Sequence, residues 1–175
     1  MYDFIPQDGF RIPSNFSYLC HMHMHFISIG GAVMHNMAIA LHQAGFRVTG
    51  SDDEIFEPSR SRLAEYGLLP EKEGWHPEQI SGEIDGIILG MHARGDNPEL
   101  KRAQELGIRI WSFPEYIYEQ SREKKRVVIG GSHGKTTITA MVMHVLRHHK
   151  IDFDYMVGSH LEGFKTMVRL SADAP

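Results

Sequence analysis

The chain has 175 residues, of which 42% are hydrophobic and 23% are charged, and its formal net charge is −4. This length and apolar content allow one buried core and part of a second. The mixed, slightly acidic charge excludes the basic surface of a nucleic-acid-binding protein, so local groups must hold any anionic ligand. The single cysteine, Cys20, excludes a disulfide framework, and the N-terminus lacks the features of a signal peptide. With no apolar run long enough to cross a membrane, we expect a soluble, cytoplasmic protein.

Predicted strands and helices alternate along the chain. Short apolar runs predict strands at 25–30, 46–50, 85–90, 108–111, 126–131 and 154–158. Helical spacing, often bounded by proline or asparagine and by glycine, predicts helices at 32–44, 58–67, 97–107, 114–120 and from 135 onward. In the last helix, Ile138, Met141, Val142, Val145 and Leu146 share one predicted apolar face. The alternation predicts an α/β fold with a Rossmann-like parallel sheet, because parallel strands need helical crossovers.

A charged stretch at 120–126 separates a helix from a new strand and is the predicted domain boundary. We expect residues 1–23 to form a flexible extension, 24–123 a complete domain and 124–175 the start of a second. The stretch "HMHMH" at 21–25 allows a metal-binding interpretation, because alternate residues of a strand share a face. A ragged start to the first strand is the interpretation that we favour.

The stretch "GGSHGKTT" at 130–137 has the composition of a phosphate-binding loop, although it is shorter than the general P-loop. A strand that ends in glycines and enters a helix presents free backbone N–H groups to an anion, and the helix dipole adds to the attraction. Lys135 supplies a mobile cation for the phosphates, and Thr136 supplies a hydroxyl for Mg²⁺. The alternative is a glycine-rich turn with a solvated lysine.

A second glycine turn, "SIGGAVMHNM" at 28–37, follows the first predicted strand. Of the three glycines in a dinucleotide-binding fingerprint it has only Gly30, since Ser28 and Val33 replace the others. Gly30 and Gly31 still allow a close phosphate approach, and Asp52 stands where an acid can bind a ribose hydroxyl. A tight turn with an N-capping aspartate explains the same residues equally well.

Taken together, the shortened loop "GSHGKTT" and the upstream turns "IGGAVM" and "VTGSD" resemble the Mur ligase family over about 24–175. The resemblance implies an ATP-dependent, Mg²⁺-requiring ligase that joins an amine to the muramoyl carboxylate of UDP-N-acetylmuramate during peptidoglycan synthesis. It implies UDP-sugar contacts at Gly30, Gly31, Asp52, Met91 and His92. It implies ATP contacts at Gly131, Ser132, His133, Gly134, Lys135, Thr136 and Thr137. Lys135 would be catalytic, and Thr136 would bind Mg²⁺ with further ligands outside this chain.

Two activities of that family compete, namely addition of L-alanine and addition of the tripeptide L-Ala-γ-D-Glu-meso-diaminopimelate in cell-wall recycling. The stretches "SDDEIFEPSRSRL" and "HARGDNPE" favour the tripeptide ligase. Because the family uses three domains, we expect a truncated gene product that binds the UDP-sugar but does not ligate alone. An alternative of another class is a non-catalytic nucleotide-binding or NAD-sensing module.

Overall fold

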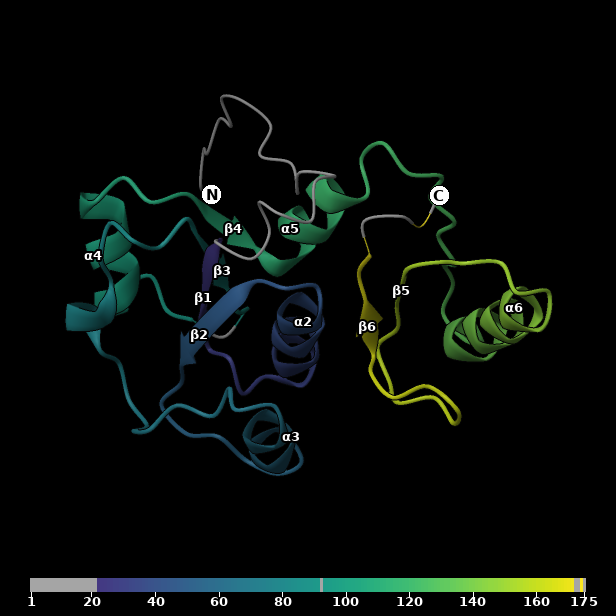
Figure 1. Cartoon of the computed structure of the whole chain (residues 1–175), viewed down its shortest axis with the longest axis horizontal. Coiled ribbons are helices and arrows are strands. Elements are labelled where there is room, and N and C mark those ends of the chain that lie inside the picture. The colour runs from purple at the N-terminus through teal and green to yellow at the C-terminus, as the bar shows by residue number, and fades with distance from the viewer. Residues whose placement is uncertain (1–21, 92, 172–173, 175) are drawn as a thin grey trace.

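A computed structural model describes residues 22–91, 93–171 and 174. In chain order the elements are β1 (His23–Ile27), α2 (Ala32–Gln43), β2 (Arg47–Ser51), α3 (Ser59–Glu65), the 3₁₀ helix η1 (Pro77–Gln79), β3 (Gly86–Leu89), α4 (Pro98–Glu105), β4 (Ile110–Ser112), α5 (Phe113–Gln120), α6 (Lys135–His148), β5 (Tyr155–Met156) and β6 (Val168–Arg169). Elements β1 to α5 form one half of the molecule, and α6, β5 and β6 form the other (Figure 1). Almost all of the predicted N-terminal extension lies outside the described residues.

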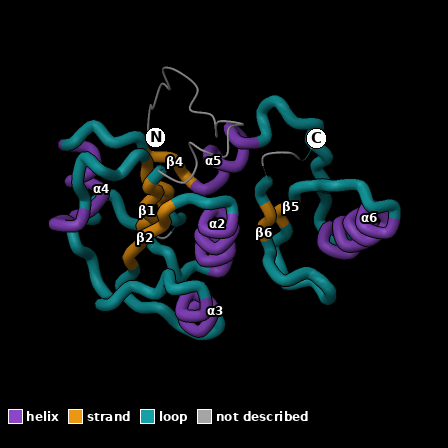
Figure 2. The backbone as a smooth tube through the Cα atoms, in the orientation of Figure 1, coloured by secondary structure: helices purple, strands orange, loops and turns teal. Residues whose placement is uncertain are grey.

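The first half is built on a four-stranded parallel sheet in the order β2-β1-β3-β4. In its register, Met24 of β1 is paired with Val48 of β2 and with Gly86 of β3. Helices follow the strands as crossovers, as the tube in Figure 2 shows. The predicted α/β, Rossmann-like fold is therefore confirmed, and β1 begins two residues before its predicted start.

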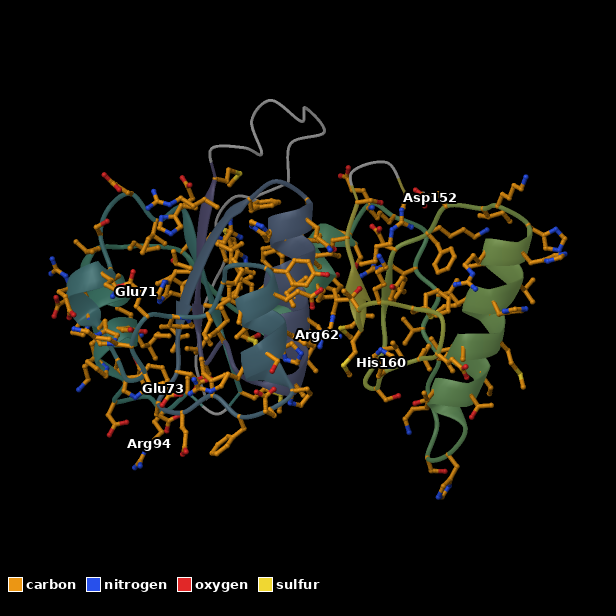
Figure 3. All side chains as sticks on the ribbon, turned by 60° about the horizontal axis from the view of Figure 1, so that its bottom comes forward. Arg62, Glu71, Glu73, Arg94, Asp152 and His160 are labelled. Carbon is orange, nitrogen blue, oxygen red and sulfur yellow. The ribbon has the colours of Figure 1, made fainter. Side chains whose placement is uncertain are left out.

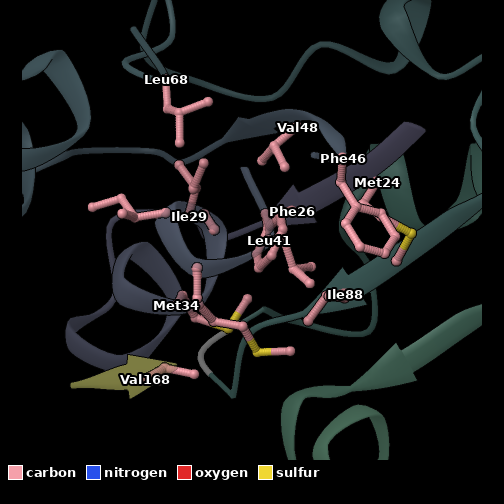
Figure 4. Close-up of a cluster of buried hydrophobic side chains, with 14 of the residues drawn as sticks. Met24, Phe26, Ile29, Met34, Leu41, Phe46, Val48, Leu68, Ile88 and Val168 are labelled. Carbon is pink, nitrogen blue, oxygen red and sulfur yellow. The ribbon is translucent and has the colours of Figure 1, made fainter. Parts of the chain in front are cut away.

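The two faces of the sheet carry separate cores. Met24 and Phe26 of β1 point to the larger core, which also contains residues of α2, α3 and α5 and the β6 residue Val168 (Figure 4). Ile27 points to a smaller core with Leu100 and Ala103 of α4. This alternation follows from the two-residue period of a strand. Helix α2 has eight buried residues in a row, Met34 to Leu41, so it lies deep in the first half.

Local capping chemistry sets the starts of α4 and α5. The Asn97 side chain accepts hydrogen bonds from the backbone N–H groups of Glu99 (2.9 Å) and Leu100 (3.0 Å), and Pro98 occupies the first turn. This is the cap that the sequence predicted. Ser112 and Glu115 form a reciprocal capping box at the start of α5.

One prediction for the second half is wrong. No strand forms at 126–131; Val127 and Val128 are 73% and 87% exposed. Helix α6 forms as predicted, but most of its predicted apolar face is exposed and its only buried residue is Met143. The physical reason is that, among the described residues, no strand pairs with 126–131; likewise no described helix or strand packs extensively against α6. The predicted strand at 154–158 is reduced to β5, which pairs antiparallel with β6.

The helices that the structure describes are all too short or too polar to cross a lipid bilayer.

Candidate nucleotide-binding turns

The β1–α2 turn is held against the end of β2 by backbone hydrogen bonds. The N–H groups of Ser28 and Ile29 both donate to the Ser51 carbonyl, at 2.9 and 3.0 Å. Ser28 has φ of 69°, in the left-handed region that non-glycine residues rarely adopt. The fingerprint glycine that the sequence lacks at position 28 is therefore replaced by a serine in a strained backbone conformation.

Gly30 is required here because Asp52 approaches it closely. The Gly30 N–H donates to Asp52 Oδ2 at 2.7 Å, and a Cβ at position 30 would lie 2.9 Å from that oxygen. It would also lie 3.2 Å from two carbons of Ile55. The structure thus brings two of the predicted UDP-sugar residues, Gly30 and Asp52, into direct contact between the turn and the end of β2.

The carboxylate of Asp52 is 7% exposed, and both of its oxygens accept backbone hydrogen bonds. Oδ1 accepts from the Asp53 N–H at 3.0 Å. Burial, reinforced by the neighbouring Asp53 side chain, raises the pKa of Asp52 to about 6. A carboxylate has about four acceptor positions, and the two backbone bonds together with the Asp53 side chain leave at most one for a ligand hydroxyl.

Helix α2 begins at this turn without a side-chain cap. Gly31 is the N-cap residue and makes no side-chain hydrogen bond. The first helical hydrogen bond runs from the His35 N–H to the Gly31 carbonyl at 3.0 Å, so the N–H groups of Ala32 to Met34 have no helical partner. A twelve-residue helix with an open N-terminus is suited to bind an anion.

The loop after β3 closes one side of the turn. A Cβ at Gly90 would lie 2.8 Å from Ser28 Cβ and 3.0 Å from the Ile27 carbonyl oxygen, so the two loops are in contact. Met91 follows directly and is 80% exposed. The structure thus brings Met91 to the same edge of the sheet as Gly30 and Asp52. The other residue predicted for this loop, His92, lies outside the described residues.

A buried carboxylate that no sequence pattern predicted, Glu99 of α4, lies beneath this turn. Glu99 of α4 is completely buried; it accepts hydrogen bonds from the Ser51 hydroxyl and from the His76 N–H (2.6 Å), and His25 Nε2 lies 3.5 Å away. Burial opposes ionisation, but these interactions outweigh it and hold the pKa of Glu99 below its usual value. The available signal was an acid beside Leu100 on the core-facing side of an amphipathic helix.

In the structure, the described histidines of the "HMHMH" stretch contact a threonine of the neighbouring strand. His23 Nε2 and His25 Nδ1 lie 2.8 and 2.9 Å from Thr49 Oγ1, so both rings share one hydroxyl of β2. Within the described part of the chain, no group of three His, Cys, Asp or Glu residues is arranged to hold a metal ion. His21 lies outside that part.

The second turn, at 130–137, has the backbone shape of an anion-binding loop. Gly134 is the N-cap of α6 with φ of 76°, and Gly131 has φ of 147°. Both glycines have positive φ, which L side chains rarely adopt, so each is required by the backbone. The side chains of Ser132 and His133 are exposed and contact each other, with His133 Nδ1 3.2 Å from Ser132 Oγ.

Lys135 lies over this loop. Its Nζ donates to the carbonyls of Gly131 (2.6 Å) and Ser132 (3.1 Å) while the side chain remains exposed. A phosphate bound to the loop would offer the ammonium a full negative charge in place of two carbonyl dipoles. The lysine is therefore placed to exchange these contacts for a ligand.

Thr136 and Thr137 occupy the first turn of α6, and both are exposed. Their hydroxyls are accessible at the helix N-terminus, next to the loop that Lys135 braces. One hydroxyl supplies one oxygen ligand, whereas Mg²⁺ takes six in near-octahedral geometry. The described residues thus fit one protein contact to a nucleotide-bound Mg²⁺, with other ligands supplied by phosphates and water.

Comparison with known proteins identifies the family of this chain. A model of the Mur ligase family, catalytic domain, matches residues 23–125, which end before the phosphate loop. UDP-N-acetylmuramate–L-alanine ligases of Sorangium cellulosum and Dictyoglomus turgidum are 37% and 35% identical over 150 and 139 residues, covering 86% and 79% of this chain but 31% and 29% of the relatives. The chain thus spans about a third of the length of these curated relatives.

Two solved structures share the fold. The UDP-N-acetylmuramate:L-alanyl-gamma-D-glutamyl-meso-diaminopimelate ligase of Neisseria meningitides superposes with a TM-score of 0.73 at 28% identity, over 85% of this chain and 46% of that one. The UDP-N-acetylmuramate–alanine ligase of Thermotoga maritima gives 0.70 at 30% identity, over 85% of this chain and 35% of that one. Since the family match covers more than half of the sequence, the chain belongs to the Mur ligase family.

Proposed function

We propose that this chain provides the UDP-sugar-binding domain (24–123) and the start of the ATP-binding domain (124–175) of a peptidoglycan ligase. The single observation that carries the proposal is the pair of open helix N-termini. One follows the Gly30–Gly31 turn braced by Asp52, and the other follows the Gly131–Gly134 loop braced by Lys135.

Each turn has its own task in this proposal. The N-terminus of α2 binds the diphosphate of UDP-N-acetylmuramate, Gly30 and Gly31 allow its close approach, and Asp52 accepts a ribose hydroxyl. Met91 and His92 contribute from the loop after β3. Residues Gly131 to Thr137 cradle the ATP phosphates, and Thr136 contacts Mg²⁺.

ATP with Mg²⁺ would supply phosphorylation of the muramoyl carboxylate, which activates it for attack by an amine. The chain's own contribution is positioning and charge. The N–H groups at the start of α6 orient the phosphates, and the Lys135 ammonium meets the charge on the transferred phosphoryl oxygens.

We propose the tripeptide L-Ala-γ-D-Glu-meso-diaminopimelate as the amine substrate. Support comes from the stretches 51–63 and 92–99 and from the likeness to the Neisseria meningitides ligase, whose name includes this peptide. L-alanine is the alternative, supported by the names of the curated relatives. A ligase that joins this chain to the remainder of the Thermotoga maritima enzyme would not decide between them, because that remainder brings its own amine site. The choice needs the protein's own downstream sequence.

Binding by the chain itself is the direct test of the proposal. UDP-N-acetylmuramate should raise the melting temperature of the chain in a thermal-shift titration, and NAD⁺ should not. Asp52→Ala should weaken UDP-N-acetylmuramate binding by about 1.5–3 kcal/mol, the value of a hydrogen bond to a charged group. Glu54→Ala, which removes an exposed acid nearby that does not act on Asp52, is the matched control and should bind within a few-fold of wild type.

The outcomes separate the classes of function. Stabilisation by NAD⁺ rather than by the UDP-sugar would support a nicotinamide-sensing module, whose sequence support is the same Gly30 turn and Asp52. A folded Asp52→Ala chain with unchanged affinity would remove Asp52 from the site.

A further inference from the structure

A buried chain of polar groups crosses from the first phosphate turn to the second half of the molecule. It contains His35 and Asn36 of α2, which are 3% and 2% exposed. The other buried residues of this helix, Met34 and Met37 to Leu41, are apolar. Two adjacent polar side chains in such a helix stabilise the fold only if their hydrogen bonds are made.

Backbone groups at both ends fix the direction of the hydrogen bond between Asn36 and His35. The Met167 N–H can only donate, and its acceptor is Asn36 Oδ1 at 3.1 Å. The Asn36 amide nitrogen therefore donates, both to the Ala32 carbonyl (2.8 Å) and to His35 Nε2 (2.8 Å). His35 Nε2 must then accept, which leaves the proton on Nδ1.

The contacts at the His35 end of this hydrogen-bond network agree with the assignment of the proton to Nδ1. His35 Nδ1 lies 2.9 Å from the Gly31 carbonyl oxygen, which can only accept, and 2.9 Å from Ser59 Oγ of α3. Burial, with the positive charge of Arg62 acting in the same direction, lowers the pKa of His35, although its bond to Gly31 opposes this. The single Nδ1–H of the neutral ring donates to the Gly31 carbonyl, and Ser59 Oγ can only share that proton as a second acceptor.

The hydrogen-bonded chain connects two functional regions. Gly31 is the N-cap residue of α2 in the proposed UDP-sugar turn, and Met167 directly precedes β6 in the phosphate-loop half. Contacts on either side hold the same segment. Val168 is 1% exposed within the main core, and Arg62, at the junction of the two halves in Figure 3, donates from Nη2 to the Lys165 carbonyl at 2.8 Å.

We propose that the Asn36 amide, oriented by His35, positions residues 165–168 against the Gly31 turn and couples uridine nucleotide binding to the docking of the second half. Asn36 is a positioning residue, since its partners are Ala32, His35 and Met167. The coupling part rests on the proposed function, because it assumes a UDP-sugar at the turn. The positioning part does not, because it depends only on contacts within the chain.

Amide hydrogen exchange at Met167 reports directly on the key hydrogen bond. Asn36→Leu keeps similar volume but removes both the acceptor for Met167 and the donor to His35. Exchange of the Met167 amide should accelerate at least about tenfold relative to the β1 amides, which report global unfolding. Ser59→Ala is the matched control, because Ser59 contacts His35 but not Met167, and it should leave Met167 protected.

Coupling has a reciprocal signature. UDP-N-acetylmuramate should slow Met167 exchange in the wild-type chain, about fivefold for a typical coupling, and Asn36→Leu should lower its affinity for the UDP-sugar by the same factor. If Asn36→Leu does not fold, Asn36→Asp serves instead, because it keeps an acceptor for Met167 but loses the donor to His35. It should keep Met167 protected and lose the effect of the UDP-sugar.

The possible results are distinct. Unchanged Met167 exchange in folded Asn36→Leu, or a Ser59→Ala effect of equal size, would overturn the positioning role. Met167 exchange that does not respond to a UDP-sugar bound to the wild-type chain would overturn the coupling. If the wild-type chain binds no UDP-sugar, the proposed function and the coupling both fail, while the positioning role is still decided by the exchange of Asn36→Leu alone.

Discussion

At the scale of single residues, Asp52 shows how one buried carboxylate holds a turn in place through backbone hydrogen bonds. Both of its oxygens accept from backbone N–H groups, and one of these belongs to Gly30. Its raised pKa indicates that burial costs the ionised form more than these bonds return. The ionised form of Asp52 therefore lowers the stability of the folded chain.

That cost predicts a pH dependence of the free energy of unfolding. Between 3.8, the ordinary pKa, and about 6, the folded chain binds more protons at Asp52 than the unfolded chain does. Stability from this group is therefore present at low pH and is lost as the pH rises through 6. Asp52→Asn should remove about 1–3 kcal/mol of this loss between pH 4 and 7, as measured by urea unfolding at each pH. Glu54→Gln, at an exposed acid nearby, should keep the wild-type slope, and an equal change there would rule out Asp52 as its source.

The surroundings of Lys135 predict how its removal changes turnover and ATP binding. The test uses a fusion in which this chain replaces the matching part of the Thermotoga maritima enzyme. In this fusion, Lys135→Ala should lower turnover about 10²-fold or more. ATP binding should fall less, because the backbone N–H groups at the start of α6 remain. Phosphate release in a steady-state assay measures the first effect, and a titration with UDP-N-acetylmuramate should show unchanged affinity. Lys101→Ala, on the exposed surface of α4, is the control; turnover of Lys135→Ala within a few-fold of it would contradict the role.

At the scale of elements, β2 is packed against β1 with no room for a further methyl group. A Cβ at Gly50 would lie 2.6 Å from Ile29 Cδ1 and 2.9 Å from the Phe26 carbonyl oxygen. The backbone atom cannot move away without disturbing the pairing of β1 and β2. Glycine is thus required at this position by contact.

Gly50→Ala should consequently destabilise the chain by about 1–3 kcal/mol through overpacking. Gly82→Ala is the matched control, because a Cβ there meets nothing within 4 Å and its φ is not positive. Chemical denaturation of both variants measures the difference. Equal stabilities would mean that β1 and β2 adjust to the added methyl group and that glycine is not required at position 50.

Local signals account for the elements that the sequence predicted correctly. Caps such as Asn97-Pro98 and the apolar run at 85–90 act over a few residues, so they identify α4 and β3 without knowledge of the fold. The strand predicted at 126–131 depends instead on a neighbouring strand, because an isolated strand cannot satisfy its backbone hydrogen bonds. Similar apolar runs therefore gave a correct strand prediction at 85–90 and a wrong one at 126–131.

The candidate site divides in the same way. Gly30, Asp52 and Lys135 were predicted from spacing along the chain, and the structure places Gly30 and Asp52 in contact. The Glu99 cluster and the link from Asn36 to Met167 join residues far apart in sequence. No local pattern predicts such contacts, because they depend on strand register and on how the halves dock.

At the scale of the whole molecule, the two halves differ in how much of each helix is buried. Helices α2 and α6 have similar lengths, 12 and 14 residues, yet α2 has eight buried residues and α6 has one. Packing of an apolar face stabilises a protein helix more than its intrinsic propensity does. The second half is held to the first mainly through β6 and the segment before it.

This contrast predicts local opening of α6 without unfolding of the sheet. Opening α6 exposes little additional apolar surface, since Ile138, Met141 and Val145 are already 49%, 62% and 53% exposed. Opening α2 would expose the main core, so its amides should exchange only with global unfolding. In native-state hydrogen exchange at low denaturant, the central amides of α6 should therefore exchange at least about 10²-fold faster than those of α2. Helix α2 is the internal control, being of similar length and in the same chain. If α6 were protected as strongly as α2, its exposed apolar face would have to be covered in solution, and a sedimentation measurement of self-association would identify a second copy as the cover.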